Sequence, residues 1–268
     1  MRLARRELPP AIADPWIGLL RPSCLLRAAD DDDVVVGQLG GVPVLPEGLA
    51  WPQHPGGRGP LTFIAEIDCG QLPSDTLSMP RTGTLSFFAW DEEAAGYLEA
   101  ARVVYAPPGA PVTERDPPAG ARSYDLVELT GDLHATAPAL DSPVFREAVS
   151  DLADDDRAFL DDWQAPEPFR QGLWDLTPQP RHRIGGHAFP IQNSVELEVA
   201  HAQLGGAIAW SDPALHREAL RWTLLTQFDS DHWARMMWGD VGSLYWLIRP
   251  GDLAARRFEA ASLTWQCG

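Results

Sequence analysis

The sequence predicts a β-rich α+β fold with two structurally related halves and a few helices at the periphery. Three observations predict this fold. Glycine (23) and proline (25) together make up 48 of the 268 residues, about 18% against a usual ~12%, which favours many turns over a helical bundle. Several short apolar segments are bounded by these turn residues, as strands usually are. Finally, some of these segments have counterparts, in the same order, later in the chain.

In chain order, residues 1–33 are expected to form a helical or irregular extension. Asp14 and Pro15 are suited to cap and start a short helix that runs through Leu20. The acidic run at 30–33 is typical of a solvated loop, and five prolines keep residues 43–60 out of regular structure. Strands are then expected at these segments: 34–36, 61–68, 83–90, 102–106 and 124–129.

Residues 142–163 predict one amphipathic helix with an acidic outer face. Ser142 is a good cap and Pro143 suits the first turn. Apolar side chains recur at helical spacing, while most of the aspartates lie elsewhere on the helix. A second helix is expected from Pro213 to about Arg221, followed by strands at 223–229 and 242–248 and a short helix from Asp252 to Phe258.

An internal repeat connects the two parts of the chain. Residues 62–68 (TFIAEID) resemble residues 223–229 (TLLTQFD), and residues 83–88 (GTLSFF) resemble residues 242–247 (GSLYWL). The Gly40-Gly41 pair has a counterpart in Gly185-Gly186. Three matches in one order favour a duplicated β unit. We therefore expect a single domain over 34–267, pseudo-duplicated as about 34–130 and 180–267, with the helical insert at about 142–163.

The composition excludes some classes of protein. All 21 basic residues are arginine, so no P-loop lysine, Schiff-base lysine or pyridoxal-phosphate anchor exists. With 38 acidic residues the net charge is −17, which disfavours nucleic acid and anionic membranes as partners and favours a basic one.

The remaining counts concern redox chemistry and location. Cys24, Cys69 and Cys267 are odd in number and far apart, which argues against a four-cysteine zinc site and a disulfide framework. Prolines and acids break the segment after the first arginines, and no apolar run approaches 18 residues. The expected location is the cytoplasm.

A set of motifs resembles a known family. The first part is carried by GGVPVLP at 40–46, Trp51-Pro52 and the segments 61–68 and 83–88. The second part is carried by IGGH at 184–187, with Gln192, residues 222–229, MMWGD at 236–240 and residues 242–247. Over about 35–267 the chain resembles the YwqG-like family (DUF1963, domain of unknown function).

The resemblance implies an α+β fold with two related β-rich halves, and it supplies no activity. Some members sit beside bacterial toxin systems, which implies an immunity or interaction role. This chain has Glu66 where the family usually shows glutamine, which weakens any role tied to that amide.

Polar residues at the ends of the repeated strands are candidate ligand-binding groups. Alternate strand residues share a face, so Glu66 and Asp68 are expected opposite Phe63, Ala65 and Ile67. Gln227 and Asp229 are expected to repeat this arrangement opposite Leu224, Thr226 and Phe228. If the halves face each other, these groups converge on one cleft, where a carboxylate pair suits acid–base work. In the other interpretation they end their strands and bind local turn amides.

Loop tryptophans and neighbouring polar residues extend this candidate cleft. Trp238 and Trp51 are expected on matching connections, where an aromatic ring can stack a sugar, anchor a partner or simply close the end of the sheet. The candidate ligand-binding residues are Trp51, Glu66, Asp68, Gln192, Gln227, Asp229, Trp238 and Asp240.

A metal site is a weak alternative. Asp229, Asp231 and His232, with His187 or His182, are residue types that bind zinc or manganese, but their spacing matches no known metal motif. Turn or packing roles are favoured for these histidines, and no metal or other cofactor is expected.

No catalytic motif is present: the chain lacks G-x-S-x-G and a phosphate-binding G-x-G-x-x-G. We therefore expect a non-catalytic cytoplasmic binding or interaction protein, of an immunity-like kind, whose partner is a basic protein or a small molecule. The alternatives are a hydrolase that uses Glu66, Asp68 and Asp229, or a small-molecule or glycan-binding protein that uses the cleft between the halves.

Overall fold

The computed structural model describes residues 1–73, 78–91 and 100–268. These residues form eight α-helices, one 3-10 helix and twelve strands. The strands are β1 (Arg21–Ala28), β2 (Gly37–Leu39), β3 (Val44–Pro46), β4 (Thr62–Asp68), β5 (Thr84–Ala89), β6 (Ala101–Ala106), β7 (Val112–Glu114), β8 (Val127–Thr136), β9 (Arg183–Ile184), β10 (Thr223–Asp229), β11 (Ser243–Ile248) and β12 (Ser262–Gln266). The helices are α1 (Arg2–Glu7), α2 (Pro10–Gly18), α3 (Pro143–Ala148), α4 (Asp154–Asp161), α5 (Glu167–Leu176), α6 (Val195–Gln203), α7 (Pro213–Ala219), α8 (Pro250–Ala254) and η1 (Phe258–Ala260).

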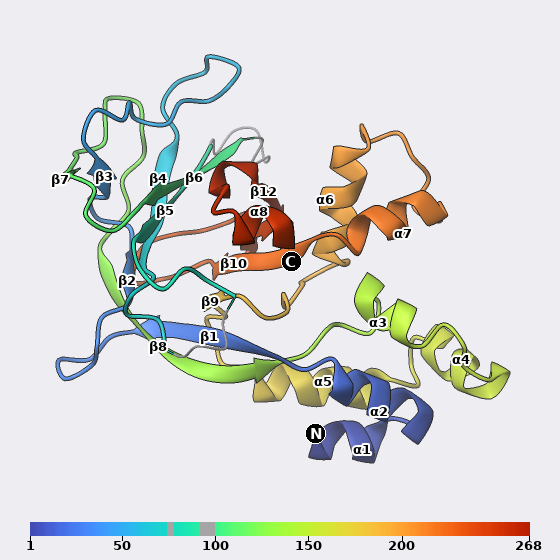
Figure 1. Cartoon of the computed structure of the whole chain (residues 1–268). Helices are drawn as coiled ribbons and strands as arrows, with labels where there is room; N and C mark the ends of the chain where they lie inside the picture. The colour runs from blue at the N-terminus through green and yellow to red at the C-terminus, as the bar shows by residue number, and fades with distance from the viewer. Residues whose placement is uncertain (74–77, 92–99) are drawn as a thin grey trace.

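Ten strands form one large, nearly closed antiparallel sheet, so the predicted β-rich α+β class is confirmed (Figure 1). The strand order is β12-β11-β10-β9-β1-β8-β2-β4-β5-β6, and β3 and β7 form a small separate sheet. The main core lies on the inner face of the large sheet. There the ring of Phe87 on β5 meets Phe228 on β10 at 5.5 Å and Trp246 on β11 at 5.4 Å. Contact between the two ends of the sheet is therefore apolar and aromatic.

The hairpins β4–β5 and β10–β11 have the same pairing. Glu66 lies opposite Ser86, and Gln227 lies opposite Tyr245. In each hairpin the register shifts at one residue, Ile64 in β4 and Leu225 in β10. These four strands were predicted from the sequence, and the structure confirms them to within two residues at each end.

The bulge corrects the predicted strand faces. Phe63 packs on the outer face against Phe88, whereas its neighbours Ile64 and Ala65 both belong to the main core. The expectation that Phe63 lies opposite Glu66 is therefore wrong, because one extra residue in the strand changes the alternation. Leu224 differs in the same way, since it packs with Tyr245 outside the main core.

Each Gly-Gly turn leads out of a short strand beside one hairpin. Gly40 N–H donates to the Ile64 carbonyl, and Gly185 N–H donates to the Leu225 carbonyl, both at 2.9 Å. All four glycines have a positive φ, between 56° and 73°, a region that L-residues rarely adopt. Glycine at these four positions therefore allows the backbone geometry of the two turns.

The N-terminal segment contributes a central strand to the sheet. β1 pairs along its whole length with β8 and at two positions with β9. The structure differs here from the expected helical or irregular extension over 1–33. The preceding helix α2 begins at Pro10, with Pro15 inside it, rather than at Asp14. β1 alternates too little in polarity to be distinguished from a loop by its own sequence.

The insert is divided into more helices than predicted. Residues 142–163 form two helices, α3 and α4, rather than one, because α3 ends at Ala148 and α4 begins at Asp154. With α1, α2 and α5 they enclose a second core around Ile12, Trp16 and Phe145. Figure 1 shows this helical group beside one end of β1 and β8.

Helices α6 and α7 lie beside the strands β11 and β12, away from α1 and α2 (Figure 1). α6 packs on the outer face of β11 and β12 and against α7. α7 starts as predicted, with the Asp212 carboxylate accepting the Ala214 N–H. Within the described ranges, no helix combines the length and apolar character that a membrane span requires.

Candidate functional site

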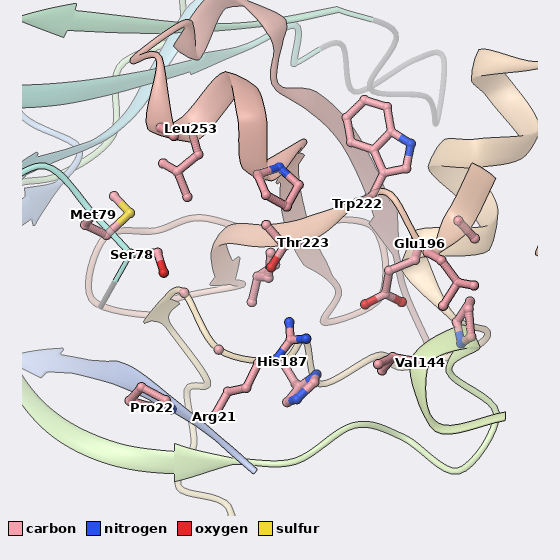
Figure 2. A pocket seen from close by; sticks show the side chains of 18 residues that line it. Arg21, Pro22, Ser78, Met79, Val144, His187, Glu196, Trp222, Thr223 and Leu253 are labelled. Atoms are coloured by element: carbon pink, nitrogen blue, oxygen red, sulfur yellow. The ribbon is translucent and has the colours of Figure 1, made fainter. Parts of the chain in front are cut away.

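A hollow of about 500 Å³ opens where the helical group meets the second half of the sheet. It is bounded by the start of β1, the Gly185-Gly186 turn, the first turns of α3 and α6, the α7–β10 connection and α8. Figure 2 shows Arg21, His187 and Glu196 on one side of this space, with Trp222 and Leu253 facing them. We call this hollow the turn pocket.

Thr136, the last residue of β8, positions two residues of the turn pocket. Its hydroxyl donates to the Arg21 carbonyl at 3.1 Å and accepts the His187 N–H at 2.9 Å. Gly186 makes this approach possible, because a Cβ there would lie 2.3 Å from the Thr136 hydroxyl oxygen. Ser23 also connects β1 to the Gly185-Gly186 turn, since its hydroxyl contacts the carbonyls of Ile184 and Gly185 at 3.1 Å.

Arg21 is the cationic group of the turn pocket. Its backbone pairs with Thr136 at the start of the β1–β8 ladder, so its position is defined by the sheet. Its guanidinium makes no hydrogen bond or ion pair with any residue that the structure describes, and its charge acts on His187 and Glu196. The pocket thus holds a cation with free donors.

His187 is buried and neutral at pH 7. Burial lowers its pKa to about 4, although its hydrogen bond with Leu19 opposes the shift; Arg21 and Arg183 add repulsion. Its Nε2 lies 2.8 Å from the Leu19 carbonyl; because a carbonyl only accepts, Nε2 carries the proton and Nδ1 is left as an acceptor.

Glu196 provides a carboxyl group in the first turn of α6. Its Oε2 accepts the Ser194 hydroxyl at 2.7 Å. Burial raises the pKa of Glu196, and the nearby charge of Asp141 raises it further. Burial also raises the pKa of Asp141, which accepts a hydrogen bond from the Ser194 backbone. Ser194 therefore joins two carboxyl groups that both resist ionisation.

The walls of the turn pocket are mostly apolar. Trp222 is fixed by its indole N–H, which contacts the Glu218 carboxylate at 3.2 Å. Leu224 and Leu253 come from β10 and α8, and Pro143 and Val144 from α3. A polar floor with apolar walls is the usual composition of a small-molecule site.

The predicted cleft residues of the first half bind their own turn. Glu66 Oε2 accepts the Val44 N–H at 3.0 Å and the Ser86 hydroxyl at 2.9 Å, and burial raises the pKa of Glu66. Asp68 Oδ1 accepts the Gly70 N–H at 2.8 Å. These contacts correspond to the interpretation in which the groups end a strand and bind turn amides.

The second half has the matching arrangement. Gln227 Oε1 accepts the Phe189 N–H at 2.9 Å, and its Nε2 donates to Asp229 Oδ1 at 2.9 Å. Asp229 Oδ2 accepts the Arg181 N–H at 2.8 Å. Each polar set therefore hydrogen-bonds beside its own hairpin, and the hairpins β4–β5 and β10–β11 meet through the aromatic core.

The remaining cleft residues are also separated. Trp238 is only 2% exposed and packs against Tyr124, so its ring faces the core. The Trp51 indole donates to the Leu61 carbonyl at 2.8 Å. Gln192 is exposed and donates to the Cys267 carbonyl, and Asp240 is exposed beside the C-terminus, where its carbonyl accepts the Gly268 N–H.

The histidine and aspartate candidates for a metal site are dispersed. His182 Nε2 lies 3.2 Å from Asp231 Oδ2, whereas His187 is in the turn pocket and His232 packs beside Trp233. Over residues 1–73, 78–91 and 100–268, no three His, Cys, Asp or Glu side chains are grouped to hold a metal ion.

Sequence reasoning missed Arg21 and Glu196. Arg21 carried no signal, since β1 was not predicted and its partners are more than 100 residues away. For Glu196 a local signal exists, because a serine followed by an acidic first turn is typical of a helix start. That signal locates α6, but not its position beside Gly186.

Comparisons with known proteins add one match. A family model described as "Domain of unknown function (DUF1963)" matches residues 37–267. A comparison with the curated proteins finds no match to this chain.

Proposed function

Because the chain belongs to the DUF1963 family, whose description assigns no activity, we propose its function from the turn pocket: it is a non-catalytic protein that binds a small molecule there. The observation that carries this proposal is a hollow of about 500 Å³ with Arg21, His187 and Glu196 on its floor and apolar walls. Ligand sites of globular proteins usually have about this volume and this mixture of groups.

The state of the polar groups favours binding over catalysis. A general base works best with a pKa near the operating pH, whereas burial lowers that of His187 to about 4. The Nε2 proton of His187 is already donated to Leu19. The hydrolase alternative needs Glu66, Asp68 and Asp229 around one cleft, and their hydrogen bonds to Val44, Gly70 and Arg181 support structural roles instead.

A pocket-filling variant tests the proposal. Ala254 is exposed on α8 and lines the turn pocket, while its neighbour Ala255 is exposed and does not line it. We expect some members of a library of small polar and amphipathic metabolites to raise the melting temperature of the native protein. Ala255→Trp should keep this response and Ala254→Trp should lose it.

Two outcomes contradict the proposal. One is that no compound stabilises the native protein. The other is that the response survives in Ala254→Trp, which would place binding elsewhere. Far-ultraviolet circular dichroism of both variants is the control for folding, and because both side chains are exposed, neither substitution removes a core contact.

A second candidate function is interaction with a basic protein. The observation that favours it is α4, whose first turn carries Asp154, Asp155 and Asp156, with Asp161 and Asp162 at its end. Five closely spaced acids attract a cationic surface. An arginine-rich peptide should bind more weakly when these aspartates become asparagine, and sodium chloride should weaken its binding to the native protein.

We also infer that the two β-rich halves arose by duplication and that the protein works in the cytoplasm. The shared register of β4–β5 and β10–β11, with the bulge at Ile64 and at Leu225, supports the duplication. The matched contacts Glu66–Val44 and Gln227–Phe189 support it as well. The two free buried cysteines, Cys24 and Cys69, are compatible with a reducing compartment.

A further inference from the structure

We propose that the turn pocket takes a small organic acid with an apolar body, whose carboxylate pairs with Arg21. This inference rests on the proposed function, because it names the class of molecule bound in the same pocket. It is carried by the Arg21 guanidinium, which faces the hollow and has no hydrogen-bond acceptor among the residues that the structure describes, and by the apolar walls around it.

The free donors of Arg21 are the first argument. A guanidinium is a planar fork of donors that matches a carboxylate with two parallel hydrogen bonds. Arg27 makes such a contact in this chain, with two hydrogen bonds to Asp33 at 2.7 and 3.2 Å. Arg21 and Glu196 both lie on the floor of the hollow, but no ion pair joins them.

The second argument is the charge of the remaining floor. Burial lowers the pKa of His187 and raises that of Glu196, and each shift favours the uncharged form of its group beside an incoming anion. Asp141 behind Glu196 also resists ionisation, and it lies near Arg146 and Arg170. Among the described residues that line the hollow, Arg21 is the one arginine.

The third argument concerns the rest of the ligand. Trp222 and Leu253 face the floor from the opposite side (Figure 2), and Leu224 also lines the hollow. Burying an alkyl or aromatic body against them is favourable by roughly 25 cal/mol per Å². An inorganic anion would satisfy Arg21 and leave these walls in water, whereas an amphipathic acid satisfies both.

Three probes of equal chain length separate the chemical classes: octanoate, 1-octanol and octylammonium. Each is titrated calorimetrically, the two ions below their micelle concentrations and 1-octanol below its solubility limit. We expect octanoate to bind the native protein roughly tenfold more tightly than 1-octanol, as one charge-assisted contact implies. Octylammonium should bind more weakly still. Arg21→Gln should weaken octanoate roughly tenfold and leave 1-octanol unchanged.

A matched control separates the effect of the position of Arg21 from the effect of removing one positive charge. Arg102 is exposed on β6 and does not line the turn pocket, so Arg102→Gln should leave all three affinities unchanged. Equal affinity of octanoate and octylammonium, with binding lost in Ala254→Trp, would overturn the acid class and keep the pocket. Failure of all three probes would overturn the acid class, and it would overturn the proposed function as well if no library compound stabilises the native protein. Binding that persists in Ala254→Trp would overturn both.

Discussion

Glu66 and Gln227 occupy the same register position in two hairpins and make the same contact. Each lies on a bulged strand, and each accepts the backbone N–H of a residue that follows a Gly-Gly turn, Val44 for Glu66 and Phe189 for Gln227. One side chain is a carboxyl group and the other is an amide. The two positions therefore offer a matched pair of experiments on one structural role.

Glu66→Gln should stabilise the protein near neutral pH. Burial raises the pKa of Glu66 above its ordinary value of 4.5, so the folded chain holds this proton to a higher pH than the unfolded chain does. The free energy of unfolding therefore falls as pH rises above about 4.5, and an amide removes that loss. We expect a melting temperature a few degrees higher at pH 7.5, with the gain absent at pH 4. An equal gain at both pH values would contradict this cause.

Gln227→Glu should have the opposite effect. Gln227 is fully buried, and its Nε2 donates to Asp229 Oδ1 at 2.9 Å. A carboxylate in its place would face the Asp229 carboxylate without a proton between them, at a cost of about 3 kcal/mol or more. Urea unfolding at pH 7.5 measures this loss. At pH 5 part of the stability should return, because the introduced carboxyl group takes up a proton.

His187 should make stability depend on mildly acidic pH. Its pKa is lowered from 6.5 to about 4 in the folded chain, so the unfolded chain binds this proton first as pH falls. Stability that is fully present above about pH 6.5 is lost as pH falls toward 4, by up to about 3 kcal/mol.

The variant His187→Gln should lose less stability between pH 7.5 and 4.5 than the native protein, by about 2 kcal/mol. His134 is exposed on β8, so His134→Gln is the control and should follow the native curve. Equal slopes for all three proteins in urea unfolding would show that His187 is not the source of the dependence.

Gly40→Ala should destabilise the first half strongly. Gly40 has φ +56°, and a Cβ there would lie 2.3 Å from the Asp125 carbonyl oxygen, which belongs to the backbone and has little freedom to move. Gly48 has φ +78° with open space around it, so Gly48→Ala carries only the backbone strain, about 1 kcal/mol.

The difference in free energy of unfolding between these two variants measures the cost of the close approach of Gly40 to the Asp125 carbonyl. We expect Gly40→Ala to cost at least about 2 kcal/mol more than Gly48→Ala in urea unfolding. If the two variants unfold at the same urea concentration, the turn moves freely and its packing against residue 125 contributes little.

The hairpin strands and the Gly-Gly turns were predictable because their signals are local. Each strand is a short apolar run between turn residues, and paired glycines indicate positive φ wherever they occur. The bulges at Ile64 and Leu225 were not predictable, since a bulge depends on the partner strand. They place Phe63 on the same face as Glu66 and Leu224 on the same face as Gln227, whereas the expected site had them on opposite faces.

The chain alone was thus sufficient for the β-rich class, for the repeated segments and for the family to which they belong, since these depend on patterns a few residues long. Only the folded chain placed Arg21, His187 and Glu196 around one hollow. That placement depends on the pairing of Arg21 with Thr136 and on the approach of Gly186 to Thr136. Contacts between segments so far apart in the chain arise from packing of the whole sheet and helical group, which no local pattern encodes.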